Sequence, residues 1–213
     1  MERHRRPREE AATRHRAGRH VLTTPALRTE RLDLEPVSPS HAEEMVGLLA
    51  DRALYVFYDD EPSPTLEELR ERYARQASGL SPDGHEVWHS WIVRERESGT
   101  AIGFVQATVG PTAGSSSAAA DTVATPYDGL SSAELAWVIG VPWQGRGFAT
   151  EAAAAVREGV RGPESATGDD VTRVHAHIAP GHVASETVAR RLGLTPTDVT
   201  HHGETRWLLT LSD

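Results

Sequence analysis

A short stretch near the middle of the chain joins a buried strand to a helix through a glycine-rich turn. The apolar run over residues 135–141 predicts the strand, and Pro142 ends it because proline has no N–H group for a sheet ladder. Residues 144–147 form the turn, and small and apolar residues at spacings of three and four over 148–160 predict the helix. The first turn of a helix has N–H groups without internal partners, so this junction is typical of an anion-binding site.

The composition of the turn suits a phosphate group. Gly145 and Gly147 have no side chain that would keep an anion away from the backbone N–H groups, and Arg146 adds a positive charge. A nucleoside triphosphate loop would need a lysine after its last glycine, and the chain contains no lysine. That class of nucleotide site is therefore excluded.

Two other anions remain as interpretations of the turn. A dinucleotide site requires a third glycine where Thr150 stands, although Asp169 and Asp170 lie at about the right distance to hold a ribose. The other interpretation, which we favour, is the pyrophosphate of coenzyme A.

Three motifs resemble those of the GNAT superfamily of N-acetyltransferases. Residues 144–149, Gln-Gly-Arg-Gly-Phe-Ala, resemble its motif A, and the longer run 134–152 is similar to the RimJ/RimL-type branch, the N-terminal acetyltransferases of ribosomal proteins. Residues 27–36, Leu-Arg-Thr-Glu-Arg-Leu-Asp-Leu-Glu-Pro, resemble the opening strand of that branch. Residues 180–194 are similar to its Pro-x-Asn-x-x-Ser motif, with His182 in place of the asparagine and Leu194 in place of a phenylalanine.

The resemblance implies an α/β (α+β) GNAT fold. We expect a mixed, mostly antiparallel seven-stranded sheet with about four helices, in which the central parallel strands splay apart. Residues 25–213 would form a single domain, preceded by a disordered basic arm at 1–24. Residues 111–131, rich in Gly, Ser, Ala, Thr and Pro, predict a flexible loop insertion.

Composition limits the environment and the partners. The chain has no cysteine, no apolar run near 18 residues and no signal-peptide core, so we expect a cytoplasmic protein without a membrane partner. Its first 20 residues hold seven arginines, whereas the whole chain has a formal net charge of −9. Nucleic-acid or ribosome binding by this arm is an alternative that we do not favour, because such arms are more often only solubilising. A homodimer is compatible with the sequence.

The resemblance implies acetyl-CoA as the co-substrate. Backbone groups near Ile139 and Val141 would pair with the pantetheine arm, and His182 and Ser185 would lie near that arm. The pyrophosphate would lie on Gln144, Gly145, Arg146, Gly147, Phe148, Ala149 and Thr150.

Two residues are candidates for catalysis in the positions that the resemblance implies. Glu134 would be the general base that takes the amine proton, and Ser185 would donate to the leaving thiolate. A surface glutamate and a helix-capping serine are the structural alternatives. Without cysteine, the amine would attack the thioester directly in a ternary complex.

The resemblance implies that the acceptor is a primary amine, either the N-terminal α-amine of a protein or a small molecule. Candidate substrate contacts are Tyr55, Phe57, Tyr58 and Trp91, for which a packed aromatic cluster is the alternative. A non-catalytic sensor or interaction module that binds acyl-CoA is the second functional hypothesis, because His182 departs from the family motif.

A metal site is not expected. His175 and His177 lie on one face of the strand predicted over 172–178, and His-x-His is a ligand-like spacing. No carboxylate lies at a supporting distance in the sequence, so the histidines are interpreted as solvated or substrate-facing.

Overall fold

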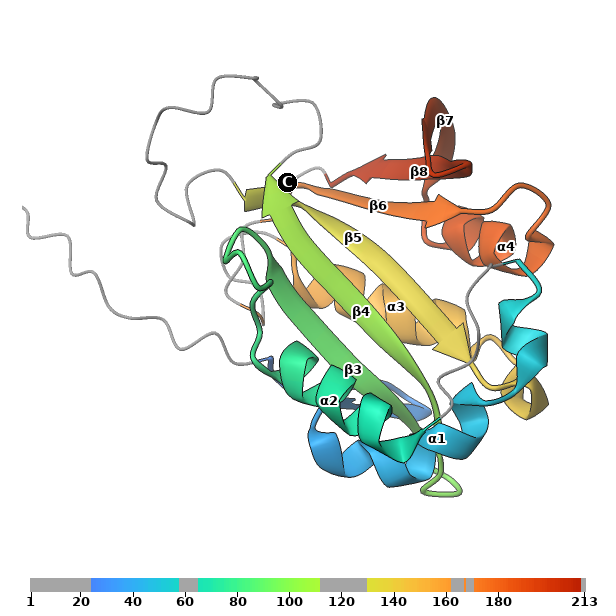
Figure 1. Ribbon diagram of the computed structural model, residues 1–213. Helices are drawn as coiled ribbons and strands as arrows, with labels where there is room; N and C mark the ends of the chain where they lie inside the picture. Colours follow the sequence, from blue (N-terminus) through green and yellow to red (C-terminus); the bar gives the residue numbers. More distant parts are fainter. Residues whose placement is uncertain (1–23, 58–64, 112–129, 162–166, 168–170, 212–213) are drawn as a thin grey trace, which may run out of the picture.

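The computed structural model describes residues 24–57, 65–111, 130–161, 167 and 171–211, and it folds them around one sheet (Figure 1). The sheet has eight strands in the order β1-β2-β3-β4-β5-β6-β8-β7. This is the expected α+β arrangement with one more strand than the seven predicted, because the opening segment divides into two strands, β1 and β2. The strands are β1 (Leu27–Arg28), β2 (Leu32–Pro36), β3 (Val87–Glu95), β4 (Ala101–Pro111), β5 (Leu130–Ile139), β6 (Arg173–Ile178), β7 (Thr195–His201) and β8 (Glu204–Thr210).

Four α-helices cover the two faces of the sheet (Figure 1). Helices α1 (Ala42–Leu49) and α2 (Leu66–Ala77) pack on β3 and β4 from one side, and α3 (Phe148–Gly159) packs on β4 and β5 from the other. Helix α4 (Val183–Arg191) contacts α3 and β6. Three short 3-10 helices complete the set: η1 (Pro39–His41), η2 (Arg52–Tyr55) and η3 (Val141–Trp143). None of the helices in the described ranges is long and apolar enough to cross a membrane.

Alternation along the strands produces a core on each face of the sheet. In β3, Trp91 and Val93 point into the α3-side core, whereas Ile92 points into the core under α1 and α2. In β6, Val174, Ala176 and Ile178 are all buried on the α3 side. Period-two alternation predicts both arrangements, and the structure confirms them.

Helix α2 begins at Leu66, directly after its capping residue. Thr65 is its N-cap, because its Oγ1 accepts a hydrogen bond from Glu68 N at 3.2 Å. The Thr65 hydroxyl also donates to the Glu68 carboxylate at 2.9 Å, so two capping contacts fix the start of the helix.

Strands β5 and β6 form the parallel pair, and they stay together for only three residues. Ser132, Ala133 and Glu134 pair with Arg173, Val174 and His175, and no further pair follows although β5 continues to Ile139. Figure 1 shows the two strands diverging from this point. Within the described part of the chain, the backbone groups of β5 beyond Glu134 therefore have no sheet partner on this side, as the expected splay requires.

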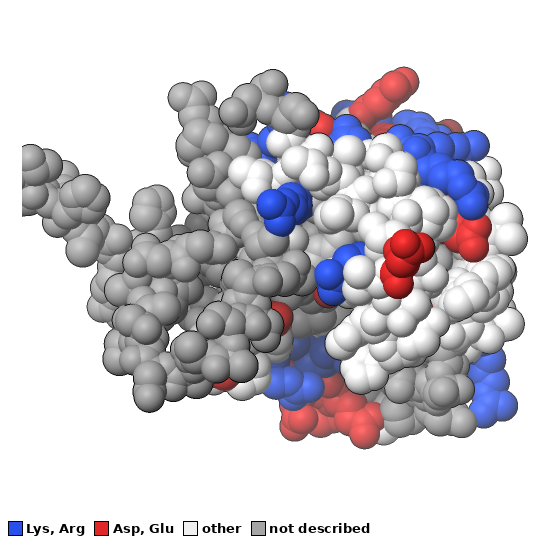
Figure 2. Space-filling view, turned by 90° about the horizontal axis from the view of Figure 1, so that it is seen from above, with Lys and Arg blue, Asp and Glu red and all other residues white. Residues whose placement is uncertain are grey.

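Charges are mixed on the described surface. The face in Figure 2 has a broad area of uncharged residues bordered by separate basic and acidic side chains. The predicted basic arm and most of the predicted loop at 111–131 fall outside the described residues.

Candidate functional site

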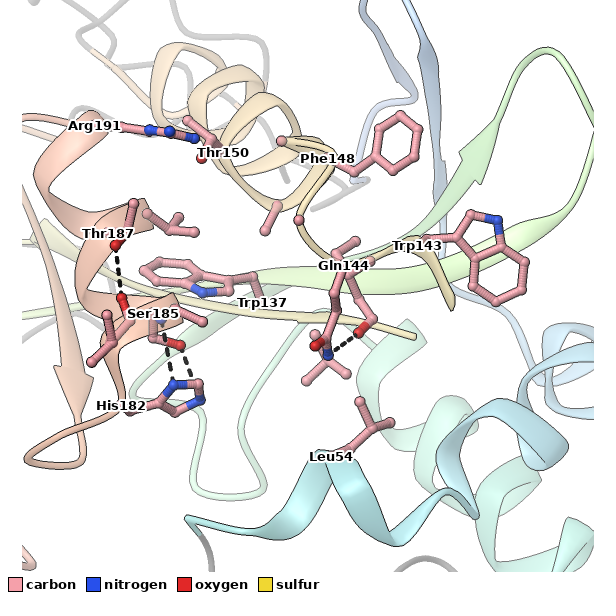
Figure 3. Close-up of a pocket in the computed structure, with 18 residues that line it drawn as sticks. Leu54, Trp137, Trp143, Gln144, Phe148, Thr150, His182, Ser185, Thr187 and Arg191 are labelled. Carbon is pink, nitrogen blue, oxygen red and sulfur yellow. Dashed lines mark hydrogen bonds between the residues drawn. The ribbon is translucent and has the colours of Figure 1, made fainter. Parts of the chain in front are cut away.

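A cavity of about 470 Å³ lies where β5 ends and α3 and α4 begin (Figure 3). Five elements and the glycine turn supply its lining: Trp137, Val138 and Ile139 from β5; Trp143 from η3; Gln144, Gly145, Gly147, Phe148, Ala149 and Thr150 from the turn and α3; His182, Val183, Ala184, Ser185, Thr187, Val188 and Arg191 from α4 and its cap; and Leu54 from η2. This set includes nine of the predicted coenzyme-binding residues.

The glycine turn presents backbone N–H groups to the cavity. Gly145 and Gly147 have φ values of 74° and 84°, a left-handed conformation that favours glycine. Gly147 is the N-cap of α3, and the first intrahelical bond runs from Glu151 N to Gly147 O at 3.0 Å. The N–H groups of residues 148–150 precede that bond, and a side chain added at Gly145 would meet only open space. The turn therefore fits a phosphate group.

Gln144 ties the turn to the end of the strand. Its Nε2 donates to Ile139 O at 2.9 Å, so its side-chain amide is engaged within the protein (Figure 3). Val141, in η3, is 39% exposed and is not among the residues that line the cavity. Ile139 thus meets the cavity, as expected, and Val141 lies beside it.

The positive charge at the cavity comes from α4 rather than from the turn. The Arg146 guanidinium pairs with Glu95 at 2.7 Å, lies over the Phe148 ring and does not line the cavity. Among the described residues of the lining, Arg191 is the only arginine, and its side chain extends toward Thr150 (Figure 3). The Arg146 guanidinium is therefore engaged by Glu95 outside the cavity lining, and the predicted contact of residue 146 with the anion stays a prediction.

A clamp from the first two strands holds the start of α3. The Glu151 carboxylate accepts hydrogen bonds from Thr29 Oγ1, from Arg31 N at 3.0 Å and from Arg31 Nε at 2.7 Å. Arg31 Nη1 also donates to Arg146 O at 3.0 Å, inside the glycine turn. The anion-binding turn is thus held from outside by a residue 115 positions earlier.

His182 and Ser185 lie together at the start of α4. His182 is the N-cap, and its Nδ1 accepts from Ser185 N at 3.4 Å, while its Nε2 lies 3.3 Å from Ser185 Oγ. Burial lowers the pKa of His182, which favours the neutral ring that capping requires. Histidine therefore replaces the capping function that asparagine would have here.

The aromatic residues predicted to contact the substrate have different surroundings. Phe57 is 43% exposed and stacks on His182 with ring centroids 4.3 Å apart, at the cavity. The Tyr55 hydroxyl donates to Leu49 O at 2.8 Å. Tyr58 lies outside the described residues. Trp91 is fully buried, and its Nε1 donates to Pro25 O, so its prediction as a substrate contact is wrong.

Glu134 lies at the point where β5 and β6 separate, on the sheet face opposite α3. Its carboxylate is 2.8 Å from His177 Nδ1 and 3.7 Å from His175 Nε2. Arg206 Nε donates to His177 Nε2 at 3.2 Å, so the ring proton of His177 is on Nδ1 and is donated to Glu134. Glu134 is 43% exposed, which leaves it accessible to a reactant while His177 orients it.

His175 completes this group. Its Nδ1 lies 3.1 Å from Ser132 Oγ, and burial lowers its pKa to about 4, with Glu134 opposing the shift. We name Glu134, His175 and His177 the fork cluster. The two histidines were predicted to share a face, but their carboxylate partner was not, because it is 41 residues away in sequence and is brought opposite His175 by the strand register.

Arg191 is the other residue that sequence reasoning missed. A signal was present, since Ala184, Val188 and Arg191 have the i, i+4, i+7 spacing of one helix face, and all three line the cavity. Arg206 gave no such signal, because only the pairing of β6 with β8 places it beside His177.

The chain matches a known protein family over most of its length. The family model described as acetyltransferase (GNAT) domain matches residues 31–195, about three quarters of the chain. A search of curated proteins found no match.

Solved structures share the fold at low sequence identity. An acetyltransferase from Agrobacterium tumefaciens str. C58 is 21% identical, with a TM-score of 0.60, covering 87% of this chain and 94% of its own. RimL, a ribosomal L7/L12 alpha-N-protein acetyltransferase in complex with coenzyme A, is 15% identical, with a TM-score of 0.60 and coverage of 88% and 98%. The aminoglycoside acetyltransferase AAC(6')-Ib, also with coenzyme A, is 16% identical, with a TM-score of 0.59 and coverage of 84% and 94%.

Proposed function

Because this chain belongs to the GNAT acetyltransferase family, whose members use acetyl-CoA, we propose that it acetylates a primary amine by direct attack on the thioester, with Glu134 as general base. The observation that carries the proposal is the position of Glu134. It lies at the last paired residue of the parallel strands, where the backbone of β5 becomes available to a ligand.

The cavity would hold the coenzyme. The N–H groups at the start of α3 and the Arg191 guanidinium would receive the pyrophosphate, since both direct positive charge to the same space. The backbone groups of β5 between Glu134 and Ile139 that have no sheet partner would hydrogen-bond the pantetheine arm, whereas the Ile139 carbonyl already accepts from Gln144 Nε2. When bound, the coenzyme supplies an activated acetyl group.

The protein then has to remove two protons from the substrate ammonium and stabilise one anion. Glu134 takes the first proton, which leaves a neutral amine, and the hydrogen bond from His177 Nδ1 orients the carboxylate. The neutral amine attacks the thioester carbonyl, so that a C–N bond forms and the C–S bond breaks, and the second nitrogen proton passes to the leaving sulfur. Ser185, which lines the cavity, donates a hydrogen bond to the departing thiolate.

Two relatives suggest the range of acceptors. RimL is described as acting on a protein α-amine, and AAC(6')-Ib as acting on an aminoglycoside. Both are primary-amine substrates, one a peptide terminus and one a small molecule. We propose that the acceptor belongs to this chemical class, reached from the exposed side of Glu134.

The test compares wild type with Glu134→Gln. We expect both to bind acetyl-CoA equally by calorimetry, while amine-dependent thiol release falls at least about a hundredfold in the variant, since a positioned base contributes roughly 10²–10⁴ in rate. Glu67→Gln, on the exposed face of α2, is the matched control.

Two outcomes would contradict the proposal. If Glu134→Gln releases thiol as fast as the wild type, Glu134 is not the general base. Tight binding by the wild type without release on a panel of peptides and small amines would instead favour a coenzyme-binding sensor.

A further inference from the structure

An unusual group of imidazoles surrounds Glu134. The rings of His175 and His177 lie 5.3 Å apart between centroids, and His201 at the end of β7 lies 5.3 Å from His177. His202 follows, 4.1 Å from His201. Four histidines and one carboxylate, from strands β5, β6 and β7 and from the turn after β7, thus lie close together where β5 and β6 separate.

We propose that the fork cluster binds a divalent transition-metal ion such as Zn²⁺. One donor atom from each of Glu134, His175 and His177 lies within 4.8 Å of the others. Two ligands of a tetrahedral ion with bonds of about 2.0–2.1 Å are separated by roughly 3.4 Å. The measured separations of 2.8 Å and 3.7 Å from the Glu134 oxygens lie on either side of that value, so small side-chain rotations complete the site.

The strand geometry accounts for the three ligands. Residues i and i+2 of a strand point to one face, so His175 and His177 present both rings to the same side. The register pairs Glu134 with His175, which adds the carboxylate from the neighbouring strand. Two imidazoles and one carboxylate are donors that suit zinc and similar ions rather than calcium or magnesium.

Arg206 disfavours metal binding at His177. Its Nε donates to His177 Nε2, which holds the ring proton on Nδ1, the atom that faces Glu134. Metal binding at Nδ1 moves that proton to Nε2, so Arg206 has to turn away. Removing the arginine should therefore tighten metal binding, because both a competing donor and a positive charge are lost.

The ion would coordinate the Glu134 carboxylate, which is the general base in the proposed mechanism. A metal bound to Glu134 prevents it from accepting the amine proton, so zinc should inhibit acetyl transfer reversibly. This consequence rests on the proposed function, whereas the binding itself does not.

Binding is tested by titrating the full chain, purified without a polyhistidine tag and treated with chelator, with CoCl₂. The d–d absorption of Co²⁺ reports coordination, and Zn²⁺ should displace it. We expect saturable binding of one ion, at least tenfold weaker in His175→Gln and in His177→Gln, and at least threefold tighter in Arg206→Met. His201→Gln, next to the cluster, should change affinity less than threefold.

The controls separate the possible failures. Far-UV circular dichroism establishes that each variant folds, and Arg206→Met tests the site by a gain of affinity that unfolding cannot produce. Absence of saturable Co²⁺ binding below millimolar concentration, or binding that the histidine variants leave unchanged, would overturn the proposal. A wild-type enzyme that binds Co²⁺ at the fork yet transfers no acetyl group would support the metal site and contradict the proposed function alone.

Discussion

Single side chains decide the electrostatics of the cavity. Arg146 and Arg191 are both close to the glycine turn in space, yet Glu95 pairs with one of them and the cavity wall includes the other. A charge that is already paired contributes little to binding an anion, because the ligand has to compete with the existing partner. The contribution of an arginine here thus depends on its partner rather than on its distance from the motif.

Arg191→Ala should weaken coenzyme A binding about tenfold, or ~1.4 kcal/mol, because a charge-assisted contact to phosphate is lost. Calorimetry in low and high salt provides the measurement, and the loss should shrink in high salt. Arg190→Ala is the matched control, since Arg190 pairs with Glu186 at 2.7 Å and packs over Trp207. Equal losses in the two variants would argue against a specific role for Arg191.

Elements far apart in sequence are joined by the clamp at the start of α3. Thr29 and Arg31, in the connection between β1 and β2, both bind the Glu151 carboxylate, so this connection holds the helix that forms the candidate anion site. Burial by itself would raise the pKa of Glu151, but the hydrogen bonds from Thr29 and Arg31 outweigh it and the pKa lies below its usual value. The ionised carboxylate is therefore the form that stabilises this junction.

Glu151→Gln should lower the free energy of unfolding by roughly 1–3 kcal/mol at pH 7, because charge-assisted bonds are lost. The unfolded carboxyl titrates near about pH 4.3, so this stability is complete above that pH and disappears as pH falls through the lower folded-state pKa. Urea unfolding at pH 7 and at pH 3.5 checks it. Glu158→Gln, at an exposed pair on the same helix, should cost about 0–1 kcal/mol, and an equal Glu151 effect at both pH values would contradict the clamp.

The clamp joins the two motifs from which much of the local structure could be predicted. The motifs at 27–36 and 134–152 predict a strand and a strand–turn–helix unit, since strand alternation and helix spacing are local properties. Their bounds differ in the structure: the first segment divides into β1 and β2, and β5 ends at Ile139, so that Val141 lies in η3. The hydrogen bonds of Thr29 and Arg31 to Glu151 link these two motifs directly.

Contacts that depend on how the strands pair could not be predicted from the sequence. The pattern of β3 predicts which face Trp91 occupies, but not that Pro25 and the core enclose it completely. Similarly, the partners of Arg146 and His177 are set by neighbouring strands, so no spacing along the chain indicates them.

At the scale of the whole molecule, the cavity joins η2 and α4 to the packed pair of β5 and α3. β5, α3, α4 and η2 all contribute to its wall, so a ligand there bridges both sides of the splayed sheet. A ligand that binds only the folded chain adds about 2.7 kcal/mol of stability at a hundredfold excess over its Kd. Coenzyme A should therefore stabilise the entire domain rather than one loop.

Scanning fluorimetry should register this as a rise in Tm of about 5–11 °C, given roughly 2–4 °C per kcal/mol for a chain of this size. NAD at the same concentration is the control and should leave Tm unchanged. A shift with NAD and none with coenzyme A would favour the dinucleotide interpretation of the glycine turn.

The clamp on α3 also has a consequence for the timing of biosynthesis. Thr29 and Arg31 leave the ribosome well before Glu151 exists, because about 120 residues separate them. At roughly 5–20 residues per second, the segment that contains Thr29 and Arg31 is synthesised about 6–24 s before Glu151, whose carboxylate binds it. A nascent chain can form its first strands early. The glycine turn is held in place only after both Arg31 and Glu151 have been translated.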